Sequence, residues 1–141
     1  MGQMKKSNFD FLTMLEELDL PSSVSQEKEK KIKHAFKKLI LFDKNNAEEI
    51  ANCFIDTVAN NHLGVYYREL YFVLDLLILL LDNSKNNRAR AICILGILND
   101  LAYFELDSAE NFKQIDIEIR KKLNMFTDEY FDIRLNSIKQ A

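Results

Sequence analysis

The side chains that most often catalyse reactions or bind metals are few and scattered in this chain of 141 residues. His34 and His62 lie in different segments, and neither has a histidine or cysteine three or four positions away. A zinc site would normally include such a pair, because that spacing brings two ligands to one side of a helix. The sequence therefore predicts no metal site.

Phosphate handling and nucleophilic catalysis also lack their usual sequence elements. Gly2, Gly64 and Gly96 are the three glycines and stand apart, so no glycine-rich loop is available to cradle a phosphate. There is no nucleophile elbow, and no pair of carboxylates shares a helix face beyond what solubility requires. We therefore expect a protein without cofactor or enzymatic activity, whose function is to bind another molecule.

Two segments carry aromatic and acidic residues of the kinds that contact partner proteins. Along a predicted helix these are Tyr67, Tyr71, Asp75 and Asp82, and around a predicted turn they are Asp100, Glu105 and Asp107. Opposite charge would steer a basic partner toward either group. We favour the second group, because a turn exposes carboxylates more surely than a central helix does. Stabilisation of a helix N-terminus is the alternative explanation for Asp107 and the nearby Glu110.

Asp75 is the most unusual of these residues, because it interrupts the apolar stretch from Leu70 to Leu81. A carboxylate buried there without a partner would cost several kcal/mol, so it should reach solvent or a partner. In one interpretation Asp75 lies on the solvent-exposed side of a central helix and is hydrogen-bonded by Tyr71 or Arg68. In the other it belongs to a partner-binding surface.

Helical periodicity recurs along the chain, and no segment shows a convincing strand pattern. We expect about seven helices, opening at Ser7 or Asn8, Ser25, Ala47, Val65, Asn87, Ser108 with Asn111, and Thr127 with Tyr130. The expected buried stripes include Ile32, Ala35, Phe36, Leu39 and Ile40 in the second helix, Phe112, Ile115, Ile119 and Leu123 in the sixth, and Phe131, Leu135 and Ile138 in the seventh. The fourth helix, over 65–81, and the fifth, over 87–104, should be the most buried, because they are apolar on most sides.

The turn between those two helices carries a recognisable pattern. Asp82 closes the first helix, Arg88 opens the second, and Ala91 follows three residues later. This pattern resembles the turn within HEAT repeats, although Asn87 stands where that family prefers a β-branched apolar residue. The resemblance implies that Asp82 and Arg88 bond neighbouring turns and that the helices stack as a right-handed solenoid.

An internal repeat supports the resemblance. A shift of about 40 residues, a period typical of HEAT-type helix pairs, places Ala51 on Ala91 and Cys53 on Cys93. We therefore expect a single all-α domain over 1–141, with a capping helix in 1–20 and three antiparallel helix pairs in 25–141. Gly96, on one face with Ala89 and Cys93, should let another helix approach closely.

Charge and cysteine content narrow the classes of partner. Residues 1–38 carry a net charge of +2 and residues 43–141 a net charge of −5. The acidic part argues against a nucleic-acid groove and favours a basic partner, and the lysines near 30–38 read as a solvated face. Cys53 and Cys93 fit buried reduced thiols of a cytoplasmic protein. No secretory signal or membrane span is expected, because the N-terminal residues are polar and the stretch from Leu70 to Leu81 is too short.

A small acidic helical stack without catalytic groups suits the masking of a surface on another protein. The chain is similar to the HEAT-like members among bacterial immunity proteins, in size, helical architecture and acidity. That resemblance implies neutralisation of a cognate toxin, such as a basic nuclease, in the cytoplasm. The alternative is a generic helical adaptor or regulatory module of a protein complex. An immunity gene would lie directly after the gene of a large secreted toxin.

Overall fold

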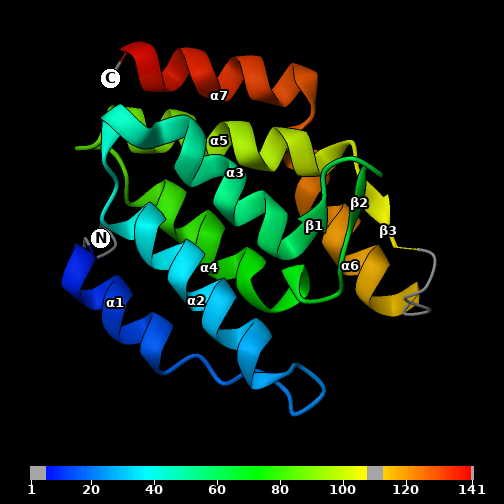
Figure 1. The fold of residues 1–141 in the computed structure, drawn as a ribbon. Helices are drawn as coiled ribbons and strands as arrows, with labels where there is room; N and C mark the ends of the chain where they lie inside the picture. The colour runs from blue at the N-terminus through cyan, green and yellow to red at the C-terminus, as the bar shows by residue number, and fades with distance from the viewer. Residues whose placement is uncertain (1–5, 108–112, 141) are drawn as a thin grey trace, which may run out of the picture.

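The structure, a computed structural model, describes residues 6–107 and 113–140 and is built mainly of helices (Figure 1). The α-helices of the described residues are α1 (Asn8–Glu16), α2 (Gln26–Ile40), α3 (Ala47–Val58), α4 (Leu70–Asp82), α5 (Arg88–Ala102), α6 (Lys113–Leu123) and α7 (Asp128–Gln140). Short 3-10 helices, η1 (Lys44–Asn46) and η2 (Asn124–Phe126), precede α3 and α7. The predicted helical class is confirmed. The expected opening of the sixth helix at Ser108 with Asn111, together with Glu110 and Phe112, lies outside the described residues.

Side-chain caps explain where several helices begin. Ser7 and Asp10 form a capping box at α1, in which each side chain accepts a hydrogen bond from the other residue's backbone N–H, at 3.1 and 2.8 Å. Ser25 Oγ accepts from the backbone N–H of Lys28 at α2, and Asn87 Oδ1 accepts from that of Arg90 at α5. These bonds satisfy N–H groups that have no partner within the helix.

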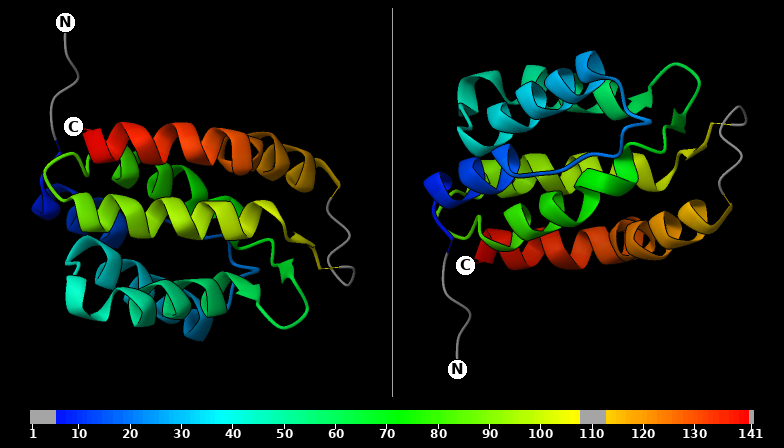
Figure 2. Two further views of the ribbon diagram at one scale, coloured as in Figure 1. Left: turned by 90° about the horizontal axis from the view of Figure 1, so that it is seen from above. Right: turned by 90° about the horizontal axis from the view of Figure 1, so that it is seen from below.

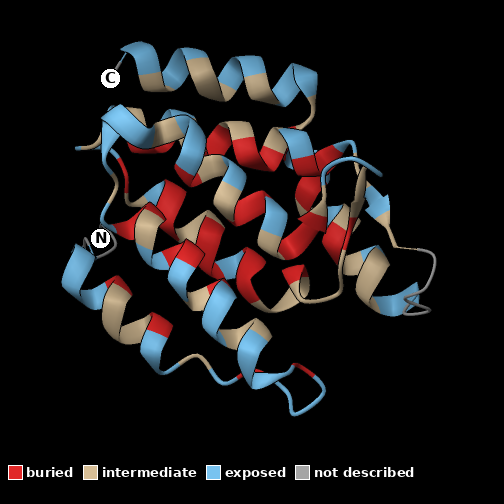
Figure 3. Cartoon of the chain, viewed as in Figure 1, coloured by how far each residue is buried: buried red, intermediate tan, exposed pale blue. Residues whose placement is uncertain are grey.

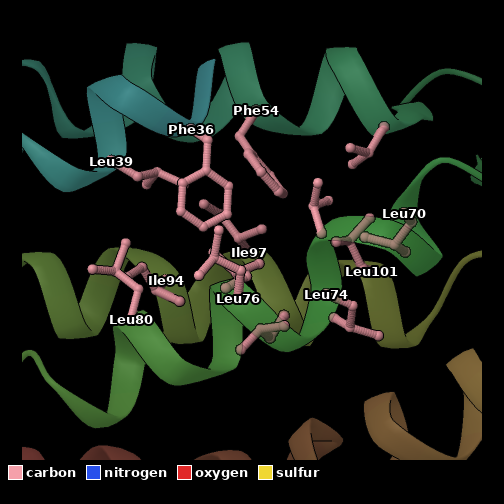
Figure 4. Packing of buried hydrophobic residues seen from close by; sticks show 14 of the residues in the cluster. Phe36, Leu39, Phe54, Leu70, Leu74, Leu76, Leu80, Ile94, Ile97 and Leu101 are labelled. Atoms are coloured by element: carbon pink, nitrogen blue, oxygen red, sulfur yellow. The ribbon is translucent and has the colours of Figure 1, made fainter. Parts of the chain in front are cut away.

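The hydrophobic core is centred on α4 and α5, as predicted. Seven residues of α4 and eight of α5 are buried, whereas α2 has five buried residues and α3 has four. Side chains of α2, α3, α4 and α5 meet in this core (Figure 4), where the Phe36 and Phe54 rings pack edge to face at 5.9 Å. The helix α5 packs between α3 and α7, and it also contacts α4 and α6 (Figure 2).

A small β-sheet joins two segments that are distant in the sequence, and our expectation of no strand was wrong. Its strands are β1 (Ala59–Asn60), β2 (Val65–Tyr66) and β3 (Glu105–Leu106), in that order. β1 and β2 are antiparallel, and β2 and β3 are parallel. Strands of two residues are too short to show an alternating pattern. As a result, the fourth helix begins at Leu70 rather than Val65, and the fifth ends at Ala102 rather than Phe104.

Gly64 makes the hairpin between β1 and β2 possible. Its φ of 64° lies in the left-handed region that glycine adopts without steric cost. Asn60 Oδ1 accepts a hydrogen bond of 3.1 Å from the backbone N–H of Leu63 and closes the same turn. Gly64 therefore supplies the left-handed residue of this hairpin turn.

Part-buried polar contacts attach the sheet and the end of α5 to α6. The fully buried Tyr66 donates its hydroxyl hydrogen to Asp116 Oδ1. Arg120, one turn further along α6, donates to the carbonyl oxygens of Ala102 at 2.7 Å and Phe104 at 3.0 Å. The guanidinium thus satisfies the Ala102 carbonyl at the end of α5 and the Phe104 carbonyl in the segment that follows it. Together these bonds fix α6 against the region where α5 leads into β3.

α7 covers one side of α5 and is the least buried helix of the described chain (Figure 3). The predicted stripe residues Phe131, Leu135 and Ile138 are half-buried against the core. Tyr130 and Ile133 are 52% and 61% exposed. The structure places Ile119 and Leu123 of α6 fully inside, as predicted.

The turn between α4 and α5 differs from our expectation in its arginine. Asp82 and Arg88 are both exposed, whereas Arg90 is 4% exposed. Arg90 donates to Ser84 Oγ at 2.8 Å and to Asn8 Oδ1 at 2.8 Å. The buried place in the turn therefore belongs to Arg90 and not to Arg88, because its position on α5 faces inward.

Gly96 is not the site of close helix approach that we expected. A Cβ built at Gly96 would have no neighbour within 4 Å, so the space beside it is open. We predict that Gly96→Ala raises the free energy of unfolding by about 0.5–1 kcal/mol, because alanine has the higher helix propensity. Urea denaturation of both proteins checks the prediction, and a destabilised variant would show that another side chain needs this space.

No helix of the described residues is long and apolar enough to cross a membrane.

Candidate protein-binding surface

The aromatic and acidic residues of α4 are largely occupied by contacts within the molecule. Lys122 Nζ of α6 lies 2.7 Å from Asp75 Oδ1 and 5.7 Å from the centre of the Tyr71 ring. The Asp75 side chain is 76% exposed, so this carboxylate reaches both solvent and a partner. Its partner is Lys122 instead of the Tyr71 or Arg68 that we expected. A hydrogen bond with Glu118 raises the pKa of Tyr71.

Tyr67 and Asp82 do not extend this group into one open surface. Lys28 of α2 lies over the Tyr67 ring, with Nζ 4.8 Å from its centre. Asp82 is exposed, but it lies at the C-terminal end of α4, seven residues and about 10 Å beyond Asp75. The four predicted contact residues therefore do not form one open surface. Tyr67 contacts Lys28, Tyr71 and Asp75 contact Lys122, and Asp82 lies apart from them.

The second predicted group, at the end of α5, is more open. Asp100 and Glu105 are exposed, and Asp107 is half-buried. Glu105 and Asp107 lie on either side of Leu106 in β3. Their backbone N–H groups donate to the carbonyl oxygens of Gly64 and Tyr66, at 3.0 and 2.9 Å. Alternate residues of a strand point to one side, so these two carboxylates share a face.

Tyr103 joins this acidic group to the start of α7. It caps the end of α5, is 58% exposed, and donates its backbone N–H to the Asp100 carbonyl oxygen at 3.2 Å. Its hydroxyl oxygen accepts a hydrogen bond of 3.4 Å from the backbone N–H of Asp128, and a hydrogen bond with the Asp128 side chain raises the pKa of Tyr103.

We call these five residues, Asp100, Tyr103, Glu105, Asp107 and Asp128, the Tyr103 surface. Sequence reasoning missed Tyr103 and Asp128. The spacing of three between Asp100 and Tyr103 was an available signal, because it places them on one side of a helix. The contact with Asp128 is tertiary and left no signal in the sequence.

The chemistry of the Tyr103 surface is that of recognition. Carboxylates accept hydrogen bonds from lysine and arginine, and an exposed tyrosine adds a rigid aromatic contact that also accepts a cation over its face. Arg120 donates to the backbone carbonyls of Ala102 and Phe104, so its guanidinium is engaged within the molecule. Among the described residues, no group of three or more histidine, cysteine or carboxylate side chains is arranged to hold a metal ion.

Comparisons with protein family models, with curated proteins and with solved structures gave no significant match.

Proposed function

We propose that this protein binds a basic protein through the Tyr103 surface and masks the partner's own functional surface. The observation that carries the proposal is the exposed aromatic ring of Tyr103, whose hydroxyl group contacts Asp128 and which lies within three residues of the exposed carboxylates of Asp100 and Glu105 in the chain. Exposed tyrosines are over-represented among residues that dominate binding energy, and surrounding charges accelerate association with a partner of opposite sign.

The most specific form of the proposal is an immunity protein that neutralises a cognate bacterial toxin, such as a basic nuclease, in the cytoplasm. The opposite charge of a basic toxin domain would complement the Tyr103 surface, and the binding would need neither cofactor nor catalysis. The protein would then act by binding the toxin and covering its functional surface. The competing function is that of a generic adaptor in a protein complex. The gene of an adaptor need not follow a toxin gene, whereas an immunity gene would.

We further propose that the helices form three antiparallel HEAT-like pairs, α2 with α3, α4 with α5, and α6 with α7. Three observations support it: α2 packs on α3, α4 packs on α5, and α3, α5 and α7 lie in contact as a row. α6 reaches α7 through η2. A right-handed stack of such pairs would place α3, α5 and α7 in one layer, which ends at the Tyr103 surface.

Affinity capture tests the proposed function. The tagged wild-type chain, expressed in its native host, should retain one predominant basic protein that mass spectrometry identifies. The triple variant Asp100→Lys/Glu105→Lys/Asp107→Lys should lose it. A matched triple variant, Glu48→Lys/Glu49→Lys/Asp56→Lys, reverses three exposed carboxylates of α3 and should retain it.

Each result decides between the functions. A toxin encoded directly upstream supports immunity, and a component of a housekeeping complex supports the adaptor. Capture of no protein by the wild type, or equal loss of the partner in both triple variants, would contradict the Tyr103 surface as the site.

A further inference from the structure

A hollow of about 600 Å³ lies at the opposite end of α5 from the Tyr103 surface. It is half open to solvent and is lined by the turn between α4 and α5, the first half of α5 and the last half of α7. Pockets of about 300–1,000 Å³ typically hold small ligands, and spaces between helices are among their usual places. The volume and the location therefore both fit a ligand site.

The floor of the hollow is apolar. Leu81 and Leu95 are 8% and 0% exposed, and Ile138 of α7 is half-buried beside them. An apolar group seated on this floor would leave water, and that transfer is favourable in proportion to the area removed. The floor alone does not select a ligand, because most pockets have an apolar lining.

The rim selects the charge of the ligand. Lys85, Arg88 and Arg134 line it, and Asp82 is the one carboxylate among the lining residues. Arg134 is held in place by the Phe126 ring, with Cζ 4.7 Å from the ring centre. This excess of cations stands out in a chain whose net charge is −3. A bound anion would form charge-assisted hydrogen bonds with these groups.

We propose that this hollow binds a small carboxylate with an apolar body, of the class of medium-chain fatty acids. The carboxylate pairs with Lys85 and Arg88 at the mouth, and the alkyl chain lies on Ile138 and on the accessible edge of Leu81. The proposal rests on the lining of the hollow and is independent of the proposed function, because no residue of the Tyr103 surface lines it.

Titration with octanoate, followed by backbone amide NMR and isothermal calorimetry, tests the proposal. Octan-1-ol has the same alkyl length without the charge and should bind at least about fivefold more weakly. Lys85→Gln/Arg88→Gln should weaken octanoate binding by a similar factor, because both side chains are exposed and their pairing is partly screened. Lys30→Gln/Lys121→Gln removes the same charge from exposed sites away from the hollow and should bind octanoate as the wild type does.

A steric variant makes the test independent of charge. Ser137 is exposed and lines the hollow, so Ser137→Trp should fill it and abolish octanoate binding without loss of folding, checked by thermal melting. The shifted amides should belong to α4, α5 and α7 around the hollow. Absence of saturable octanoate binding, equal affinity for octan-1-ol, or wild-type affinity in either hollow variant would overturn the proposal.

Discussion

Replacing Arg90 by alanine is expected to lower the free energy of unfolding by about 3–5 kcal/mol, the largest effect we predict for a single polar side chain. Arg90 donates to Asn8 of α1, to Ser84, and to the carbonyl oxygens of Ile40 at 3.0 Å and Asn83 at 3.1 Å. Three parts of the chain, 82 residues apart at most, therefore meet at one guanidinium. Alanine would leave the buried Ser84 Oγ and Ile40 carbonyl oxygen without this donor and would also leave a cavity.

Guanidinium denaturation of matched variants measures this effect. Arg88→Ala, two residues away and exposed, is the control and should change the free energy of unfolding by no more than about 0.5 kcal/mol. Arg90→Lys should remain strongly destabilised, because an ammonium group cannot reproduce the planar fork of donors. A loss below about 1 kcal/mol in Arg90→Ala would mean that the three segments do not depend on this residue.

The second large effect is expected at Tyr66, where phenylalanine should cost about 1–3 kcal/mol at neutral pH. Tyr66 is fully buried, and its hydroxyl group bonds Asp116 across the junction of β2 and α6. Phenylalanine keeps the ring but leaves that carboxylate without its buried donor. Tyr130→Phe is the control, since the Tyr130 side chain is half exposed and its substitution should be nearly neutral.

The same residue gives the stability a defined pH dependence. Burial, followed by the bond to Asp116, raises the pKa of Tyr66 above the usual value of about 10. The folded state therefore holds this proton more tightly than the unfolded state does. The resulting stability is fully present below pH of about 10 and is lost as the pH rises above it.

Denaturation at a series of pH values between about 7 and 11 separates this contribution from other alkaline effects. The wild type and Tyr130→Phe should lose stability above pH of about 10 more steeply than Tyr66→Phe does. Parallel pH profiles for the wild type and Tyr66→Phe would show that the phenol is not protected in the folded protein.

Much of the helical framework could be predicted because its signals are local. The second predicted helix names Ile32, Ala35, Phe36, Leu39 and Ile40 as its inner face, and the structure buries all five. Helical periodicity and a capping serine within one segment are sufficient for such a prediction. The burial of α4 and α5 followed from the same kind of evidence, since few of their positions are polar.

The failures have one physical cause, which is dependence on distant partners. β2 pairs with β3 about 40 residues further along the chain, at Val65 and Glu105, so neither two-residue segment shows a strand pattern alone. Arg90 was overlooked because arginine is normally exposed. Its spacing of four and seven from Ile94 and Ile97 nevertheless places it on the buried face of α5, and this was a readable signal.

The candidate site was predicted in part for the same reason. Asp100, Glu105 and Asp107 are close in sequence and could be recognised as one acidic segment. Tyr103 could have been added from its spacing of three to Asp100, but its contact with the backbone of Asp128, 25 residues away, depends on tertiary packing. Similarly, the pairing of Asp75 with Lys122 depends on where α6 packs, which the α4 sequence does not specify.

The most direct test of the proposed function is the association rate of the captured partner with the wild type and with Asp100→Lys/Glu105→Lys/Asp107→Lys, measured at about 50 and 300 mM salt. We predict at least a tenfold slower association at the lower salt, and a smaller difference at the higher salt, because screening weakens steering. The α3 triple variant should associate faster than the Tyr103-surface variant at both. A folded Asp100→Lys/Glu105→Lys/Asp107→Lys variant with wild-type rates and affinity at both salt concentrations would contradict the account.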